Sequence, residues 1–234
     1  MQPINGPSGS GALLPAIDDR KYPNIGDRLN AAKVSWAWYA GGWNDAVAGH
    51  PGPLFQFQFH PFTYFADYAP GTPGRAHPRD ETAFVAAARA GTLPTVSFVK
   101  PYGHENEHPG YASEADGSDH LVDLLKTITT GPDAKSTLVV VTYDEFGGQW
   151  DHVPPPGSNR RTRGVHDRFG PGTRVPALLL SAAFRTSSVD HTAYDTTSIL
   201  ATIEDSVHVA PLSSRDFAVF DLRDAIRLGL AGRR

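Results

Sequence analysis

The stretch of sequence that most constrains the fold is an apolar run at residues 137–142, Thr-Leu-Val-Val-Val-Thr, which leads directly into acidic residues and glycines. A run that is apolar through its middle is typical of a strand covered on both faces within a parallel sheet. We therefore expect residues 137–142 to form a central strand. Ligands in open α/β sheets gather at the carboxyl ends of strands, so the residues that follow are candidates for a functional site.

The rest of the chain alternates between helix and strand patterns. Helices are predicted over residues 24–32, 80–90, 118–129 and 196–207, and strands over residues 34–39, 95–99 and 175–180. The segment between residues 40 and 78 has too many aromatic rings to lie in solvent, so it is predicted to pack as an ordered excursion. This order predicts an α/β fold, with a mostly parallel central sheet and helices on both faces.

Residues 1–23 are dense in Gly, Pro and Ser and show no apolar periodicity, which predicts a mobile leader. Residues 24–234 are expected to form a single domain, because 234 residues suffice for one good core. The beginning of the chain has neither the charged region nor the apolar region of a signal peptide. No apolar run approaches the roughly 20 residues that span a bilayer, so no transmembrane segment is expected.

Composition excludes several classes of function. The chain has no cysteine, so it has no disulfide and no thiolate nucleophile, and any metal must be bound by oxygen or imidazole. The net charge of -4 gives no broad positive field for nucleic acid, which is therefore not an expected partner. Motifs for nucleotide phosphates, for dinucleotides and for the Gly-x-Ser-x-Gly serine hydrolases are absent from the sequence.

The acidic pair Asp144 and Glu145 follows the apolar run and is itself followed by two glycines. Two adjacent carboxylates repel each other unless a cation lies between them or water screens them. For an isolated Asp-Glu pair, a hydrated turn would be the preferred interpretation. Here the glycine turn and a second acid-imidazole pair, Asp151 and His152, favour a metal-binding or catalytic role.

A second polar segment, residues 100–111, follows another predicted strand and contains Glu107 and His108. Its side chains could bind a metal, move protons or bind a phosphoryl oxygen, and the alternative is a polar surface loop. His60 lies within the aromatic excursion, where a structural histidine is as good an interpretation as a site residue. His191 stands just before a predicted helix, and its neighbour Asp190 could orient the ring.

Together these segments resemble the bacterial phosphoesterase family, which contains phospholipases C and acid phosphatases and belongs to the alkaline phosphatase superfamily. The resemblance covers nearly everything after about Tyr22, in the order of the family. The segments that carry it are Tyr143-Asp144-Glu145 through His152-Val153-Pro154-Pro155-Pro156, Asn106-Glu107-His108-Pro109-Gly110-Tyr111, Asp190-His191 and Tyr194-Asp195-Thr196-Thr197-Ser198-Ile199-Leu200.

The resemblance implies an alkaline-phosphatase-like fold and roles for eight residues. Asp144 and Glu145 would hold a divalent metal ion, for which Ca, Zn, Mg and Mn all stay open. Catalytic roles fall to His108, His60 and His152, and substrate contacts to Glu107, Asp151 and His191. The substrate would be a small phosphate ester or a phospholipid headgroup. Full-length relatives are generally exported, which implies a periplasmic or secreted location for them.

The N-terminal part of the family, with its Glu-Asn-Arg-Ser-Phe-Asp segment and hydroxyl nucleophile, has no counterpart in this sequence. Residues 24–234 therefore match the C-terminal part of the catalytic domain, and the sheet is expected to be incomplete. We expect metal-dependent hydrolysis of phosphate esters from the complete enzyme and little from this chain alone, unless a missing half comes from another chain. The alternatives are a non-catalytic remnant that binds metal or phosphate, and a sulfatase-like hydrolase.

Overall fold

The computed structural model describes residues 16–155 and 172–231 of the 234-residue chain. The chain separates into two compact units, Met1–Pro132 and Asp133–Arg234. Residues 1–15 of the expected leader lie outside the described part. Within the described part, Ile17 pairs with Phe65 in a parallel bridge, so the chain is already tied to the first unit before its first helix.

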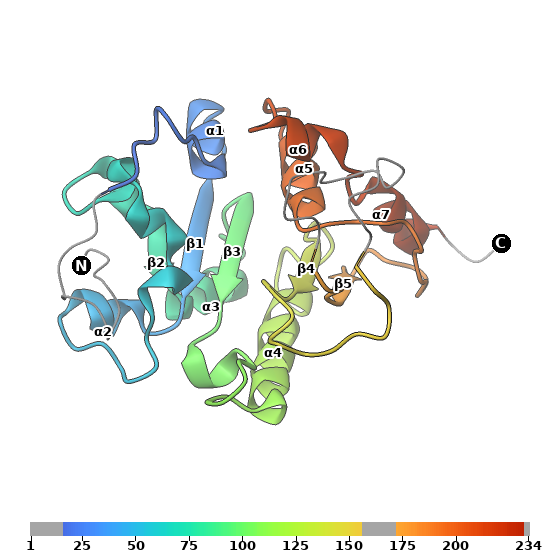
Figure 1. The fold of residues 1–234 in the computed structure, drawn as a ribbon, viewed down its shortest axis with the longest axis horizontal. Coiled ribbons are helices and arrows are strands. Elements are labelled where there is room, and N and C mark those ends of the chain that lie inside the picture. The colour runs from blue at the N-terminus through green and yellow to red at the C-terminus, as the bar shows by residue number, and fades with distance from the viewer. Residues whose placement is uncertain (1–15, 156–171, 232–234) are drawn as a thin grey trace. The chain divides into compact units, whose positions relative to one another are not determined.

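A three-stranded parallel sheet forms the centre of the first unit (Figure 1). Its strands are β1 (Trp36–Ala40), β2 (Pro78–Asp80) and β3 (Val96–Lys100), and β1 lies between the other two. Helices flank this sheet, which confirms the predicted α/β fold class. The strands predicted at residues 34–39 and 95–99 are confirmed as β1 and β3.

One face of the sheet is covered by two α-helices. Side chains alternate between the faces of a strand, so Ala37 and Tyr39 of β1 point the same way. They share a buried cluster with Phe84 of α3 (Glu81–Ala90) and Leu124 of α4 (Glu114–Thr129). The predicted helices at residues 80–90 and 118–129 are therefore confirmed, and they bury the apolar stripes that identified them.

The other face of the sheet is covered by the aromatic excursion, as predicted. Trp36 of β1 lies 4.6 Å from the Phe62 ring and is stacked on His77 at 4.0 Å, while Tyr68 is fully buried. Trp38 also meets Phe62, at 5.7 Å. The excursion is built from α2 (Trp43–Val47) and the 3-10 turns η1 (Phe57–Phe59), η2 (Pro61–Tyr64), η3 (Ala66–Tyr68) and η4 (Pro73–Ala76).

Side-chain caps fix where the helices of the first unit begin. Asn24 and Asp27 form a reciprocal capping box at α1 (Ile25–Ala31), as the predicted Asn24 cap requires. Asp80 caps α3 through the Thr82 N–H. Helix α4 begins four residues earlier than predicted, because Ser113 accepts a hydrogen bond from the Asp116 N–H. The polar side chains of the first turn of α4 hid this start from the apolar pattern.

The second unit contains β4 (Val139–Thr142) and β5 (Ala177–Leu180), which pair in an antiparallel two-stranded sheet. Three helices follow, namely α5 (Thr197–Ser206), α6 (Ser214–Ala218) and α7 (Arg223–Leu230). The strand predicted at residues 175–180 and the helix predicted at residues 196–207 are confirmed. Helices α6 and α7 were not predicted.

The expectation that residues 137–142 form a central strand of a parallel sheet is wrong for the part of the chain that the structure describes. There β4 pairs with β5 alone, in the antiparallel direction, and each residue of β4 keeps partial or full exposure. An apolar run reports the tendency of a strand to be covered. It carries no information on the direction or number of its neighbours, and β5 has the same apolar character as β4.

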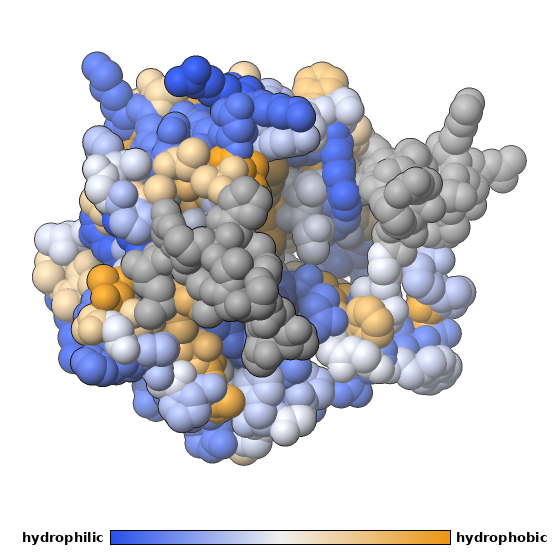
Figure 2. All heavy atoms as spheres, turned by 60° about the vertical axis from the view of Figure 1, so that its left-hand side comes forward, coloured by the Kyte–Doolittle hydropathy of each residue, from blue (hydrophilic) through white to orange (hydrophobic). Residues whose placement is uncertain are grey.

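Hydrophilic residues dominate the visible face in Figure 2, where apolar residues occur in small groups separated by polar ones. In the aromatic excursion, Phe59, Phe62 and Tyr68 are buried. Within the described residues, no helix combines the length and the apolar character that crossing a membrane requires.

Candidate functional site

Asp144 and Glu145 follow β4 after one intervening residue, Tyr143, and both are exposed. Gly147 and Gly148 have φ angles of 61° and 74°, in the left-handed region that favours glycine. The predicted tight glycine turn is therefore confirmed. Glu145 Oε2 accepts a hydrogen bond of 2.8 Å from the Gly147 N–H, so this carboxylate stabilises the turn as well as facing solvent.

Asp151 is the most strongly held acidic residue near this turn. Arg174 donates to it from Nε at 2.7 Å and from Nη2 at 2.9 Å, and the Val153 N–H donates at 2.9 Å. Arg174 lowers the pKa of Asp151 to about 2. His152, whose side chain is largely exposed, places Nδ1 3.5 Å from the same carboxylate. The structure thus brings Asp151 and His152 together, and adds Arg174, whose role the sequence pattern did not reveal.

His191 is exposed, and its neighbour Asp190 is occupied by other donors. Asp190 accepts from the Tyr194 hydroxyl at 2.6 Å, and from the Thr192 N–H and hydroxyl at 2.9 and 2.8 Å. The Tyr194 hydrogen bond is the largest of the effects that lower the pKa of Asp190. The negative charge of Asp190 stays next to His191, while its oxygens hold the turn that leads to α5.

In the first unit, Glu107 and His108 lie on the loop that follows β3. Glu107 has a φ of 61°, which is uncommon for a residue with a side chain and is found where the surroundings fix the backbone. The Ser118 hydroxyl donates to Glu107 Oε1 at 3.2 Å. The exposed His108 ring is stacked on Tyr111 at 4.3 Å, and its Nδ1 lies 2.7 Å from the Pro109 carbonyl oxygen. Hydrogen bonds and ring stacking therefore fix the conformation of this loop.

His60 is fully buried next to the Trp43 ring, at 4.1 Å. Burial lowers its pKa to about 3, with a further contribution from the positive charge of Arg75, so the ring is neutral at physiological pH. Neither ring nitrogen makes a hydrogen bond of good geometry within the described residues, although the Ala40 backbone is within reach. A buried neutral imidazole can accept a proton or a metal only if the surrounding rings open.

A cavity at the carboxyl ends of the three parallel strands was missed by the sequence reasoning. It is lined by Glu81, by Glu105 of the short turn η5 (Gly103–Glu105), and by His120 of α4, among others. His120 Nε2 lies 2.7 Å from Glu81 Oε1, and its Nδ1 lies 3.7 Å from Glu105 Oε1. Contact with Glu81 raises the pKa of His120 against the effect of burial. The partners are distant in sequence, so no local pattern joins them.

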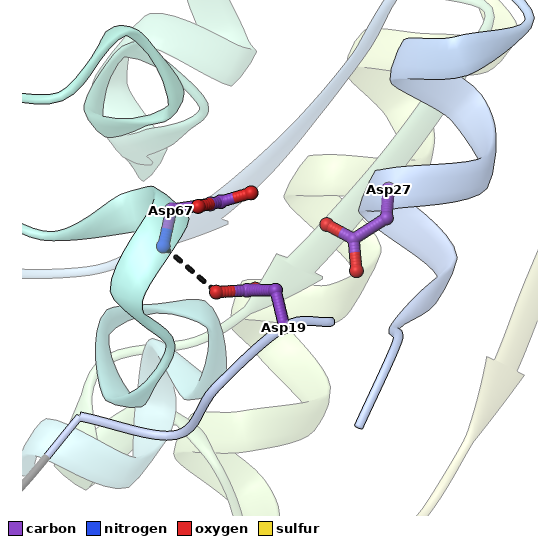
Figure 3. A group of neighbouring side chains, drawn as sticks. All are labelled: Asp19, Asp27 and Asp67. Carbon is purple, nitrogen blue, oxygen red and sulfur yellow. Dashed lines mark hydrogen bonds between the residues drawn. The ribbon is translucent and has the colours of Figure 1, made fainter. Parts of the chain in front are cut away.

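Three further carboxylates of the first unit, from Asp19, Asp27 and Asp67, face a common space (Figure 3). They come from three segments, and an oxygen of each lies within 4.8 Å of the others. Three carboxylate oxygens could bind a hard divalent cation. Burial raises the pKa of Asp19, and the negative charges of Asp67 and Asp27 raise it further.

Protein donors already serve two of these three carboxylates. Asp19 accepts a hydrogen bond from the Asp67 backbone N–H at 2.9 Å and another from the Asn24 side chain, through Nδ2, at 3.2 Å. Asp27 accepts from the Tyr68 hydroxyl at 3.0 Å and from the Asn24 N–H at 2.8 Å. These bonds hold α1 against the aromatic excursion, so the triad has a structural role with or without a metal.

The two carboxylates of Asp144 and Glu145 can supply roughly two to four oxygen donors, whereas calcium and magnesium take about six or more. In the described residues, these two acids do not belong to a group of three potential ligands that meet around one point. Their carboxylates fit a hard divalent cation chemically and could supply part of its coordination shell.

A profile of the phosphoesterase family matches residues 12–210. The chain belongs to the phosphoesterase family. The chain is 31% identical over 200 residues to phospholipase C B of Mycobacterium tuberculosis, and the match covers 76% of this chain and 37% of the relative. It is 29% identical over 216 residues to a non-hemolytic phospholipase C of Burkholderia pseudomallei, covering 78% of this chain and 29% of the relative.

A plant relative shows a similar level of identity over a shorter stretch. Non-specific phospholipase C1 of Arabidopsis thaliana is 29% identical over 128 residues, which covers 46% of this chain and 23% of the relative. The chain thus spans about a third of the length of the curated bacterial relatives it matches. The predicted resemblance to the phosphoesterase family is confirmed.

Proposed function

We propose that this chain takes part in metal-dependent hydrolysis of phosphate esters, of the phospholipase C or acid phosphatase type. The observation that carries the proposal is the family match over residues 12–210, which includes the Asp144 and Glu145 turn after β4. The relatives named phospholipase C support a phosphate ester or a phospholipid as the substrate. By the same kinship we propose a periplasmic or secreted location for the protein.

In the second unit, Asp144 and Glu145 would hold a divalent cation. A bound cation would neutralise the negative charge of a phosphoryl group, which is the main requirement of phosphoryl transfer. The exposed His152 ring, next to the Asp151 carboxylate, would bind a phosphoryl oxygen as an imidazolium or hold a proton at its outer nitrogen. His191, next to the negative charge of Asp190, would contact the substrate in the same way.

In the first unit, His108 is the histidine best suited to contact a substrate. It is exposed, its ring is oriented by stacking on Tyr111, and its backbone N–H is fixed by the Asn106 side chain at 3.0 Å. Glu107 would position this loop through its contact with Ser118. His60 would act on the substrate only in a state that exposes it, because the ring is fully buried.

Metal binding by the chain is the first test, because it needs no turnover. Titration calorimetry with Mn²⁺, Ca²⁺ and Zn²⁺ should show one site that Asp144→Asn or Glu145→Gln removes. Asp224→Asn, at an exposed position of α7, is the matched control and should bind as the wild type does. Loss of the same site in Asp27→Asn, with unchanged binding in Asp144→Asn, would place the metal at the Asp19, Asp27 and Asp67 triad and contradict the proposal.

Catalysis is tested in a complete relative, phospholipase C B of Mycobacterium tuberculosis. Replacing the acids aligned with Asp144 and Glu145 should lower hydrolysis of nitrophenyl phosphate esters by about 100-fold or more. Nitrophenyl sulfate should be turned over poorly by the parent enzyme. Efficient sulfate hydrolysis would instead support a sulfatase-like activity, and full phosphate hydrolysis by the variants would remove the assigned site.

A further inference from the structure

The cavity at the carboxyl ends of β1, β2 and β3 has a volume of about 720 Å³, which is in the range of small-molecule sites. All its lining residues belong to the first unit. Gly41 and Gly42, which follow β1, border the cavity. Asp80 at the end of β2, Glu81 after it, and Tyr102 after β3 also line it. This is the position where open parallel sheets bind ligands.

The lining of the cavity is acidic. Its charged side chains include four carboxylates, from Asp45, Asp80, Glu81 and Glu105, and one guanidinium, from Arg89. His104 and His120 each add a positive charge when protonated, and the four acids still outnumber these three cations. A partly enclosed site with this balance attracts a positively charged ligand, because low-dielectric walls strengthen the local field.

Glu81 offers a buried acceptor that the described residues do not use. The residue is 7% exposed, and its Oε1 makes the ion pair with His120. Its Oε2 is buried, has no hydrogen-bond partner within the described part of the chain, and belongs to a side chain that lines the cavity. A buried carboxylate oxygen without a donor is unfavourable, so a donor from a ligand would complete the site.

A metal ion is a poorer match to this cavity than an N–H donor. The imidazole of His120 lies between two carboxylates, with one nitrogen turned to Glu81 and the other to Glu105. In the described residues, no three potential ligand atoms of this cavity lie within 4.8 Å of one another. The two carboxylates thus lie on either side of an imidazole, as ion-pair partners, and keep further capacity to accept hydrogen bonds.

We propose that this cavity binds a small organic ligand through an ammonium group, with the carboxylates of Glu81 and Glu105 as the hydrogen-bond acceptors. Glu81 lies at the start of α3 and Glu105 on η5, so the ligand contacts two elements that follow different strands. An alkylammonium group offers three N–H donors, which two carboxylates can accept at once. The proposal does not depend on hydrolysis of phosphate esters.

The test uses 1,4-diaminobutane as the probe and titration calorimetry of the chain at neutral pH. We expect saturable binding of one molecule per chain, weakened by about 10-fold or more in Glu81→Gln and in Glu105→Gln, as loss of a charge-assisted hydrogen bond predicts. Tetramethylammonium carries the same type of charge without N–H donors and should bind far more weakly. Asp123→Asn, at a highly exposed acid of α4, should bind the diamine as the wild type does.

Several results would overturn the proposal. They are the absence of saturable binding, equal binding by the wild type and both glutamine variants, equal binding of tetramethylammonium, or displacement of the diamine by stoichiometric Zn²⁺. Glu105 is partly exposed, so its variant serves if the buried Glu81→Gln fails to fold by circular dichroism. Asp144→Asn should not affect diamine binding, which separates this test from that of the metal site in the second unit.

Discussion

Arg174 donates two hydrogen bonds to the Asp151 carboxylate, although the two residues are 23 positions apart in the sequence. Such a pair of hydrogen bonds matches the planar guanidinium to both carboxylate oxygens and fixes their orientation. Asp151 therefore has a structural role, because it links the segment after the glycine turn to Arg174. His152 gains a fixed negative neighbour from the same arrangement.

Removing the guanidinium in Arg174→Ala should raise the pKa of Asp151 from about 2 towards its ordinary value of about 3.9. The folded-state pKa of Asp151 is depressed, so its stabilising effect is present above about pH 4 and is lost as the pH falls towards 2. NMR titration of the Asp151 carboxyl group measures the shift. Arg227→Ala, which removes a different exposed ion pair, is the control and should leave the Asp151 midpoint unchanged. An equally low midpoint in Arg174→Ala would show that other groups hold the charge.

His60 should make the protein less stable as the pH falls. Its folded pKa of about 3 lies below the unfolded value of about 6.5, so the unfolded state takes up the proton first. The effect is absent above about pH 6.5 and should reach about 3 kcal/mol at pH 4. Comparing unfolding free energies of the wild type with those of His60→Gln and His60→Phe across this range should show a flatter dependence in both variants. His50→Gln, at an exposed position, is the control and should keep the pH dependence of stability of the wild type. An NMR signal of the His60 ring that titrates near pH 6.5 would contradict the low pKa of this residue.

His120 should have the opposite effect. Its pKa is raised, mainly by Glu81, so the stabilisation from this pair is complete below about pH 6.5 and is lost as the pH rises through the folded-state value. Thermal unfolding of His120→Gln should lack the loss of stability that the wild type shows on the alkaline side. Glu81→Gln should produce the same change, because either substitution breaks the pair. A wild-type alkaline limb that survives in both variants would show that another group causes it.

Gly117→Ala should destabilise the protein, even though alanine is the better helix former by about 1 kcal/mol. A Cβ atom at residue 117 would collide with the Glu107 side chain, which packs directly on α4. We expect a net loss of about 1–2 kcal/mol in urea unfolding. Truncating the neighbour in a Gly117→Ala/Glu107→Ala double variant should recover most of that loss. Asp119→Ala, at an exposed position of the same helix, should cost little, and similar behaviour of Gly117→Ala would mean that the loop moves away easily.

The elements that could be predicted from the sequence are those whose signals are local. Helices begin after Asn24 and Asp80 because the side chains of these residues cap them. Strand β1 is predicted by the alternating pattern of its side chains. The glycine turn after Asp144 and Glu145 was predictable for the same reason, since only glycine adopts its backbone angles readily. Family membership followed from the order of such segments.

Features that depend on distant partners could not be predicted. The apolar β4 sequence gave no sign that its neighbour would be the antiparallel β5, and the acid of residue 151 gave no sign of Arg174. His120 lies among the polar positions of an amphipathic helix, so the sequence pattern predicts an exposed side chain. Only the fold places it between Glu81 and Glu105.

The alternation of side chains along β1 separates two unlike layers by a single strand. Aliphatic and tyrosine contacts with α3 and α4 lie on one side, and the two tryptophans meet the aromatic excursion on the other. One inserted or deleted residue within this five-residue strand would exchange the two sets, sending indole rings towards a space shaped for alanine. The length of β1 is therefore under tighter constraint than the identity of any one of its side chains.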